Sequence, residues 1–144
     1  MRLRLFVDAN VIVSAVLTGG PARSLLFAAE QDRLETITSG YVLAEVENAI
    51  VTKLRRPAEV LSGALARMRL VVCKEASDRA VAQAHQLVRD PKDAAVLAAA
   101  WGASVDALVT GDKDLLEATA DLRIRVLRTT EALALLSDRA LREG

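Results

Sequence analysis

Four acidic residues occupy positions that ordinary solvation on a helix surface does not explain: Asp8, Glu45, Asp93 and Asp112. Asp8 directly follows an apolar run that is typical of a buried strand, and Asp112 shortly follows a second such run. Glu45 stands within an apolar helical segment, and Asp93 stands in the first turn expected for an alanine-rich helix. A carboxylate that closes a buried strand needs a partner, because burying an unpaired charge is costly. These acids are therefore candidates for one shared site.

A cluster of carboxylates predicts a divalent cation. Like charges a few ångströms apart raise one another's pKa and destabilise the fold. Mg²⁺ or Mn²⁺ relieves this repulsion, prefers hard oxygen ligands and usually keeps several waters. The natural chemistry of such a site is hydrolysis of a phosphodiester, in which the metal polarises the phosphate and lowers the pKa of a water. One or two metal ions held by the four acids would make a histidine general base unnecessary.

Each acid taken alone also has a simpler interpretation. Asp93 at a helix start could simply complement the helix dipole, and Asp112 in Gly-Asp-Lys-Asp could simply stabilise a turn. Glu45 could be a solvated helix residue. Asp8 is harder to explain in this way, so the hypothesis of a shared site depends on the four acids occurring together.

The elements that would carry these acids alternate between strands and helices. We expect strands at 3–7, 35–39, 70–73, 107–110 and 124–127. We expect helices at 11–17, 21–31, 42–50, 57–68, 78–88, 91–102 and 131–141, with a short one at 115–116. This order predicts a three-layer α/β/α sandwich with a mostly parallel central sheet of about five strands. The carboxyl ends of parallel strands share one rim of the sheet, so the four acids would meet there.

Length and composition favour a single domain that spans residues 1–144. The chain is 52% hydrophobic and 3% aromatic, so its core consists mostly of Ala, Leu and Val, which favours a helix-rich domain. The 19 basic and 19 acidic residues balance, so no global basic field indicates a nucleic-acid partner, although a local basic patch remains possible. The sequence shows no signal peptide and no apolar run of membrane-spanning length, so we expect a soluble cytoplasmic protein.

Four short motifs contain these acids. In chain order they are Val7-Asp8-Ala9-Asn10-Val11, the segment from Ser39 to Glu45-Val46, Asp90-Pro91-Lys92-Asp93-Ala94, and Leu108-Val109-Thr110-Gly111-Asp112-Lys113-Asp114. They resemble the motifs of PIN-domain proteins. Each motif is weak alone, whereas the ordered set is specific and spans most of the chain. The resemblance extends to the toxin components of bacterial toxin–antitoxin pairs that are related to the VapC toxins. It implies a metal-dependent endoribonuclease, a homodimer and inhibition by an antitoxin.

The resemblance assigns roles residue by residue. Its acidic metal-binding set is matched by Asp8, Glu45, Asp93 and Asp112. Asn10 matches the polar residue beside the first acid and would orient ligands or water, and Thr110 matches the hydroxyl residue before the last acid. Asp90 and Asp114 are further acids of the same motifs and would support the metal ligands from outside. The segment after Glu45 is shorter than in many relatives, which bears on the shape of the substrate groove.

A small basic cluster follows Glu45 and consists of Lys53, Arg55 and Arg56. These residues could bind RNA phosphates, although a solvated helix end explains them equally well. Two alternatives to RNA hydrolysis stay open. The chain could be a regulatory or binding module that has lost the activity, or a metal-dependent phosphatase or DNA nuclease, since the same chemistry cleaves any phosphate ester.

Overall fold

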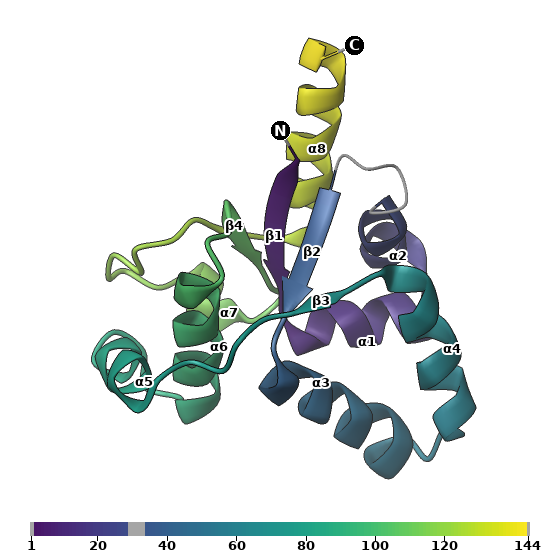
Figure 1. The fold of residues 1–144 in the computed structure, drawn as a ribbon, viewed down its shortest axis with the longest axis horizontal. Coiled ribbons are helices and arrows are strands. Elements are labelled where there is room, and N and C mark those ends of the chain that lie inside the picture. Colours follow the sequence, from purple (N-terminus) through teal and green to yellow (C-terminus); the bar gives the residue numbers. More distant parts are fainter. Residues whose placement is uncertain (1, 29–33, 144) are drawn as a thin grey trace.

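A parallel sheet forms the centre of the molecule (Figure 1). The computed structural model describes residues 2–28 and 34–143. Its strands are β1 (Leu3–Val7), β2 (Leu34–Thr38), β3 (Val71–Val72), β4 (Ala107–Val109) and β5 (Val126–Leu127). They are ordered β3-β2-β1-β4-β5, and every neighbouring pair is parallel. The predicted α/β/α sandwich with a five-stranded sheet is confirmed, and β1 is its central strand.

Helices cover both faces of this sheet (Figure 1). They are α1 (Ala9–Leu17), α2 (Gly20–Phe27), α3 (Gly40–Glu47), α4 (Ala58–Met68), α5 (Asp78–His85), α6 (Pro91–Gly102), α7 (Lys113–Leu116) and α8 (Thr129–Glu143), with a π-helix, η2 (Asn48–Lys53), after α3. In the view of Figure 1, α5, α6 and α7 lie on one side of the sheet, and α1, α2 and α4 lie on the other. The third layer predicted by the alternating pattern is therefore present.

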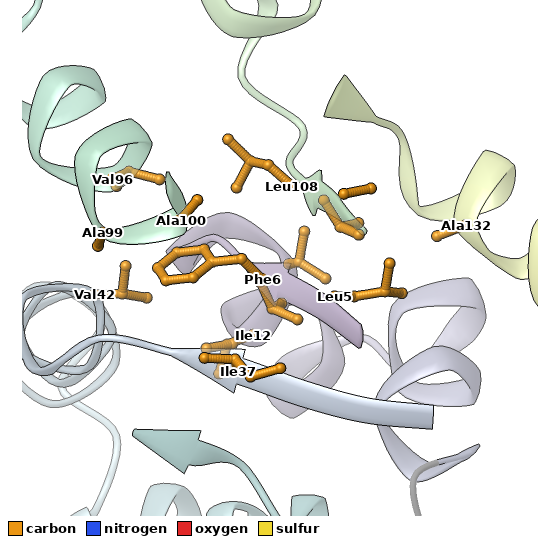
Figure 2. Packing of buried hydrophobic residues seen from close by; sticks show 14 of the residues in the cluster. Leu5, Phe6, Ile12, Ile37, Val42, Val96, Ala99, Ala100, Leu108 and Ala132 are labelled. Atoms are coloured by element: carbon orange, nitrogen blue, oxygen red, sulfur yellow. The ribbon is translucent and has the colours of Figure 1, made fainter. Parts of the chain in front are cut away.

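The core explains why β1 is apolar along almost its whole length. Leu5 and Phe6 are fully buried, and their side chains leave opposite faces of the strand (Figure 2). Phe6 lies toward Val96 and Ala100 of α6, whereas Leu5 lies toward Ala132 of α8 (Figure 2). A strand buried on both faces in this way is rigid, and it holds the residue that follows it in a fixed place.

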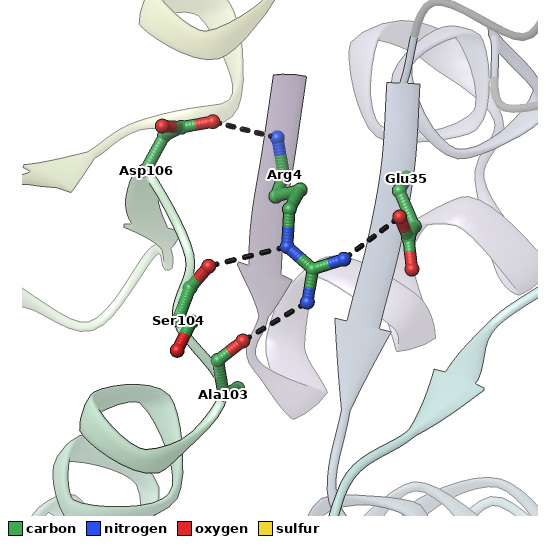
Figure 3. Close-up of polar contacts among 5 residues, drawn as sticks. All are labelled: Arg4, Glu35, Ala103, Ser104 and Asp106. Atoms are coloured by element: carbon green, nitrogen blue, oxygen red, sulfur yellow. Dashed lines mark hydrogen bonds and ion pairs between the residues drawn. The ribbon is translucent and has the colours of Figure 1, made fainter. Parts of the chain in front are cut away.

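Arg4 is the polar exception in β1, and it joins three segments at the amino end of the sheet (Figure 3). Its guanidinium forms an ion pair of 2.8 Å with Glu35 of β2 and donates hydrogen bonds of 3.1 and 3.0 Å to the carbonyls of Ser104 and Ala103. Its backbone N–H donates to the Asp106 carboxylate. These contacts fix the register of β1 between β2 and β4 at the end opposite to Asp8.

Several predicted boundaries were wrong. Strand β2 begins at Leu34, one residue before the predicted start, and Leu34 is buried opposite Leu3. The preceding helix, α2, ends at Phe27, and the predicted end at Gln31 lies outside the described residues. Strands β3 and β5, the two edge strands of the sheet, have only two residues each and are shorter than predicted. The helix that carries Glu45 continues beyond Glu47 as a π-helix.

The apolar helices of the amino-terminal part serve the core. Within residues 2–28 and 34–143, no single helix is both long and apolar enough to cross a membrane. The pair α1 and α2 passes that test only jointly, with a bend of 103° between the helices. Their buried residues belong to the hydrophobic core, among them Ile12 and Leu25.

Candidate active site

The carboxyl ends of β1 and β4 meet where the chain reverses its direction across the sheet. From β1 the chain proceeds outward through β2 to β3, and it returns through α5 and α6 to β4 on the other side of β1. In open α/β sheets, ligands bind in the crevice outside the strand ends at such a switch point. Asp8 follows β1 and Thr110 follows β4, so both residues stand at this crevice.

Asp8 is the N-cap of α1 and is only 6% exposed. Its Oδ1 accepts a hydrogen bond of 2.7 Å from the Ala9 N–H, and its Oδ2 accepts one of 2.8 Å from the Thr110 hydroxyl. Burial raises the pKa of Asp8, the bonds from Thr110 and Ala9 oppose this rise, and the charge of Asp112 adds to it. The carboxylate is thus held in one orientation within the field of a second acid.

Asn10 joins the two loops that form the crevice. Its Oδ1 accepts a hydrogen bond of 2.7 Å from the Gly111 N–H, and its Nδ2 donates to Asp8 Oδ2 at 3.4 Å and to Thr110 Oγ1 at 3.3 Å. A Cβ atom on Gly111 would lie 3.3 Å from Asn10 Oδ1, so a side chain at 111 would crowd this contact. Asn10 therefore contacts Asp8 directly and ties it to the loop that follows β4.

Asp93, Asp112 and Asp114 converge on the same place. Asp112 is the N-cap of α7, where its Oδ1 accepts a hydrogen bond of 2.9 Å from the Asp114 N–H. Asp93 lies in the first turn of α6 and is 4% exposed. Each of the three residues offers a carboxylate oxygen, and these oxygens all lie within 4.8 Å of one another. Within the described part of the chain, the buried Oδ2 of Asp93 has no hydrogen-bond partner.

Burial and the neighbouring acids raise the pKa of Asp93 to about 7. Burial is the largest cause, followed by the hydrogen bond and the charge of Asp112, and then by the charges of Asp90 and Asp8. A proton therefore relieves the repulsion among these acids near neutral pH. A hard divalent cation would relieve it more fully, because it binds carboxylate oxygens and would give the unpartnered Oδ2 a ligand bond. The donor set fits Mg²⁺ or Mn²⁺.

Glu45 approaches the acids from α3. Ser39 caps this helix by accepting a hydrogen bond of 3.2 Å from the Val42 N–H, which places Glu45 in the second turn. The Oε1 atom of Glu45 is buried and has no hydrogen-bond partner among the described residues. Burial raises the pKa of Glu45, Lys92 opposes the rise, and the charge of Asp8 adds to it. Glu45 is therefore within the electrostatic field of the cluster.

The remaining predicted residues occupy more peripheral positions. Asp90 is exposed and caps α6 by accepting a hydrogen bond of 2.9 Å from the Lys92 N–H. Lys53 ends the π-helix and lines a groove beside Glu45, whereas Arg55 and Arg56 follow on exposed chain. The structure therefore brings the four acids and Asn10, Thr110 and Asp114 to one rim, and separates Lys53 from the two arginines.

Sequence reasoning missed two residues beside Glu45. Lys92 precedes Asp93, and its charge lowers the pKa of Glu45. Tyr41 stands four residues before Glu45 on α3, and its hydroxyl also lowers the pKa of that acid. The spacing of four on a helix was a signal for Tyr41, because such residues share a helix face. Nothing in the local sequence shows that Lys92 faces a different helix.

Comparisons with known proteins bear on the family and the fold of the chain. A model of the PIN domain matches residues 4–114. VapBC2 from Rickettsia felis, solved bound to a DNA fragment from its promoter, has a chain with a TM-score of 0.65 and 14% identity, covering 88% of this chain and 98% of that one. PAE2754 from Pyrobaculum aerophilum has a TM-score of 0.63 and 17% identity, with coverage of 96% and 99%. FitAcB from Neisseria gonorrhoeae has a TM-score of 0.50 and 19% identity, with coverage of 87% and 97%.

The fold and the acidic rim define an α/β domain with a carboxylate site at the switch point of its sheet. The family model covers most of the chain, so the chain belongs to the PIN domain family, whose members are nucleases. A search among curated proteins gave no significant match. The low identities to the three solved structures establish likeness of fold alone.

Proposed function

We propose that the chain is a metal-dependent endoribonuclease and the toxin of a bacterial toxin–antitoxin pair. The observation that carries this proposal is the buried, unpartnered Oδ2 of Asp93 within a group of close carboxylates at the switch point of the sheet. The acids of such a group repel one another unless a proton or a cation binds them. Among nuclease folds, an acidic rim of this kind is suited to hydrolysis of phosphodiesters.

The acids would hold one or two Mg²⁺ or Mn²⁺ ions through Asp8, Glu45, Asp93 and Asp112. A bound ion of this kind supplies polarisation of the phosphate and activation of water. Thr110 and the Ala9 N–H keep the two Asp8 oxygens in place, and Asn10 ties the loop before α7 to α1. Asp90 would orient the ligands from the outside, from the cap of α6. Asp114 was expected in the same supporting role, but its carboxylate lies with those of Asp93 and Asp112, so it would be placed to bind the ion directly.

The expected partners follow from the family and from similar folds. The VapBC2 and FitAcB structures contain chains that this chain resembles in fold, and VapBC2 was solved on DNA from its own promoter. We infer an antitoxin protein as the inhibitor, a homodimer as the assembly, RNA as the substrate and the cytoplasm as the location. Co-expression with the product of a neighbouring small gene would test the antitoxin.

Cleavage of a mixed RNA pool by wild type and by Asp8→Asn, with and without Mn²⁺, tests the activity. We expect wild type to cut only with metal, and Asp8→Asn to be inactive because it loses a ligand charge. Asp138→Asn, an exposed acid on α8, is the matched control and should cut normally. Unchanged RNA cleavage by Asp8→Asn would contradict this mechanism. Metal-dependent cleavage of DNA in place of RNA would favour the DNA nuclease, and cleavage of neither would favour the binding module.

A further inference from the structure

A groove of about 440 Å³ opens beside the acidic site and is continuous with it. Its lining comes from α1, α3, η2 and the start of α6, and α1 and α3 lie side by side in Figure 1. Val13 and Leu17 of α1 give it an apolar part. Asn10 and Glu45 belong both to the acidic site and to this groove, so a chain bound along the groove would reach the acids.

Lys53, the last residue of the π-helix, lines the groove. From this segment of the chain the lining residues are Glu45, Asn48, Ala49 and Lys53, which follow one another at the spacing of a single helix face. In η2 the turns are wider than in an α-helix, as the hydrogen bond of 3.1 Å from the Leu54 N–H to the Ala49 carbonyl shows. Short π-helices are rare and occur frequently at functional sites.

Lys92 supplies a second ammonium group from a different element. It lies in the first turn of α6, beside Asp93, and it lines the groove together with Lys53. Among the described residues, ion pairs join Arg4 to Glu35 and Arg128 to Glu131, and neither lysine is paired. The groove therefore carries two ammonium groups that form no ion pair within the described part of the chain, and one of them, Lys92, also acts through its charge on Glu45.

We propose that Lys53 and Lys92 form a phosphate clamp that holds the backbone of single-stranded RNA in this groove. The proposal rests on the proposed function and names how its substrate binds. A polyanion approaching the acidic rim meets repulsion, and two ammonium groups at the edge of that rim offset it. The apolar surface of Val13 and Leu17 suits the face of an unpaired base, which a duplex does not present.

The test is binding of a short fluorescent single-stranded RNA to the full chain in the presence of a chelator, where no metal-dependent cleavage intervenes. The variants are Lys53→Gln, Lys92→Gln and the double variant, with Lys74→Gln as the matched control. Lys74 is an exposed lysine after β3 that does not line the groove. We expect each clamp variant to weaken binding roughly fivefold and to reduce the slope of log K against log salt by about 0.7. Lys74→Gln should change neither quantity, and Lys53→Arg should keep the slope.

Two outcomes would overturn the clamp. The first is that Lys53→Gln and Lys92→Gln show the same slope of log K against log salt as wild type and Lys74→Gln. The second is that the protein binds duplex RNA more tightly than single-stranded RNA. This test is separate from that of the nuclease. Metal-dependent RNA cleavage together with an unchanged salt slope in the variants would contradict the clamp and support the nuclease. A reduced salt slope in the variants without any cleavage would support the clamp and contradict the nuclease.

Discussion

The Thr110 hydroxyl donates a hydrogen bond of 2.8 Å to Asp8 Oδ2 and thereby links the ends of the two strands that flank the switch point. The hydroxyl oxygen of Thr110 also accepts a hydrogen bond of 3.0 Å from the Asp112 N–H. One buried hydroxyl therefore positions the acid that follows β1 and the acid that follows Thr110 itself. The distance between these two acids depends on this side chain.

Replacement of Thr110 by valine changes the shape of the side chain little, but it should destabilise the fold strongly. The change keeps the shape, but it leaves the Asp8 carboxylate without its closest side-chain donor and the Asp112 N–H without its acceptor. We expect a loss of about 2–3 kcal/mol in the free energy of unfolding, because buried groups left unpaired carry the full cost of desolvation. Urea unfolding followed by circular dichroism measures this loss.

Thr36→Val is the matched control for that variant. Thr36 is a fully buried threonine of β2, and its hydroxyl has no hydrogen-bond partner among the described residues. Removing an unpartnered buried hydroxyl should be neutral or should stabilise by about 1 kcal/mol. Equal losses in Thr110→Val and Thr36→Val would contradict the role given to the Thr110 hydrogen bonds.

The stability of the metal-free protein should fall as the pH rises toward neutrality. The pKa of Asp93 is raised from 3.8 to about 7 in the folded chain, so between these values the folded state holds a proton that the unfolded state has released. Stability is therefore lost as the pH rises through this window, by up to about 1.4 kcal/mol per pH unit for one proton. The raised pKa values of Asp8 and Glu45 act in the same direction.

Asp93→Asn separates this contribution from the others. The amide carries no charge, so the variant should be more stable than wild type at about pH 8 and should gain less at about pH 5. Urea unfolding in chelator at the two pH values measures the difference. The prediction is contradicted if the free energy of unfolding of wild type rises from about pH 5 to about pH 8 and that of Asp93→Asn changes by the same amount. Asp93 would then be ionised at both pH values.

The sequence predicted that acids follow the buried strands, because this feature depends on local pattern alone. An apolar run that ends in Asp8 has few interpretations other than a buried strand leading to a polar site, and parallel strands send their carboxyl ends to one rim. The contacts that refine this site join residues far apart in sequence. The bond between Asn10 and Gly111 depends on β1 and β4 being neighbours, which no local pattern contains.

Packing decided the features that were predicted wrongly or missed. The second strand was predicted to begin at residue 35, but the pairing of Leu34 with Leu3 extends it by one residue. The segment after Glu47 has the pattern of an ordinary amphipathic helix, yet it is wound as a π-helix, and its last residue, Lys53, lines the groove. Propensity within one segment is a weak guide where the neighbouring elements set the outcome.

Added Mn²⁺ or Mg²⁺ should raise the melting temperature of the wild type, and a chelator should reverse the rise. Binding to the folded chain stabilises it by mass action, and the shift should be larger above about pH 7, where the cation does not compete with the proton on Asp93. Thermal unfolding with a titration of the metal measures it. Asp93→Asn and Asp8→Asn should lose most of the shift, and Asp138→Asn should keep it. A shift that survives both site variants would place the metal elsewhere.

Arg4→Met should reduce stability and leave metal binding intact. The change removes the ion pair with Glu35 and two hydrogen bonds to the loop that enters β4, for an expected loss of about 1–2 kcal/mol. Arg4 lies at the amino end of β1, whereas the acids lie at its carboxyl end, so the metal-induced rise in melting temperature should persist. Urea unfolding and the metal titration on one preparation measure both quantities. A variant that lost the metal response while still folded would mean that the register set at Arg4 controls the distance between Asp8 and Thr110.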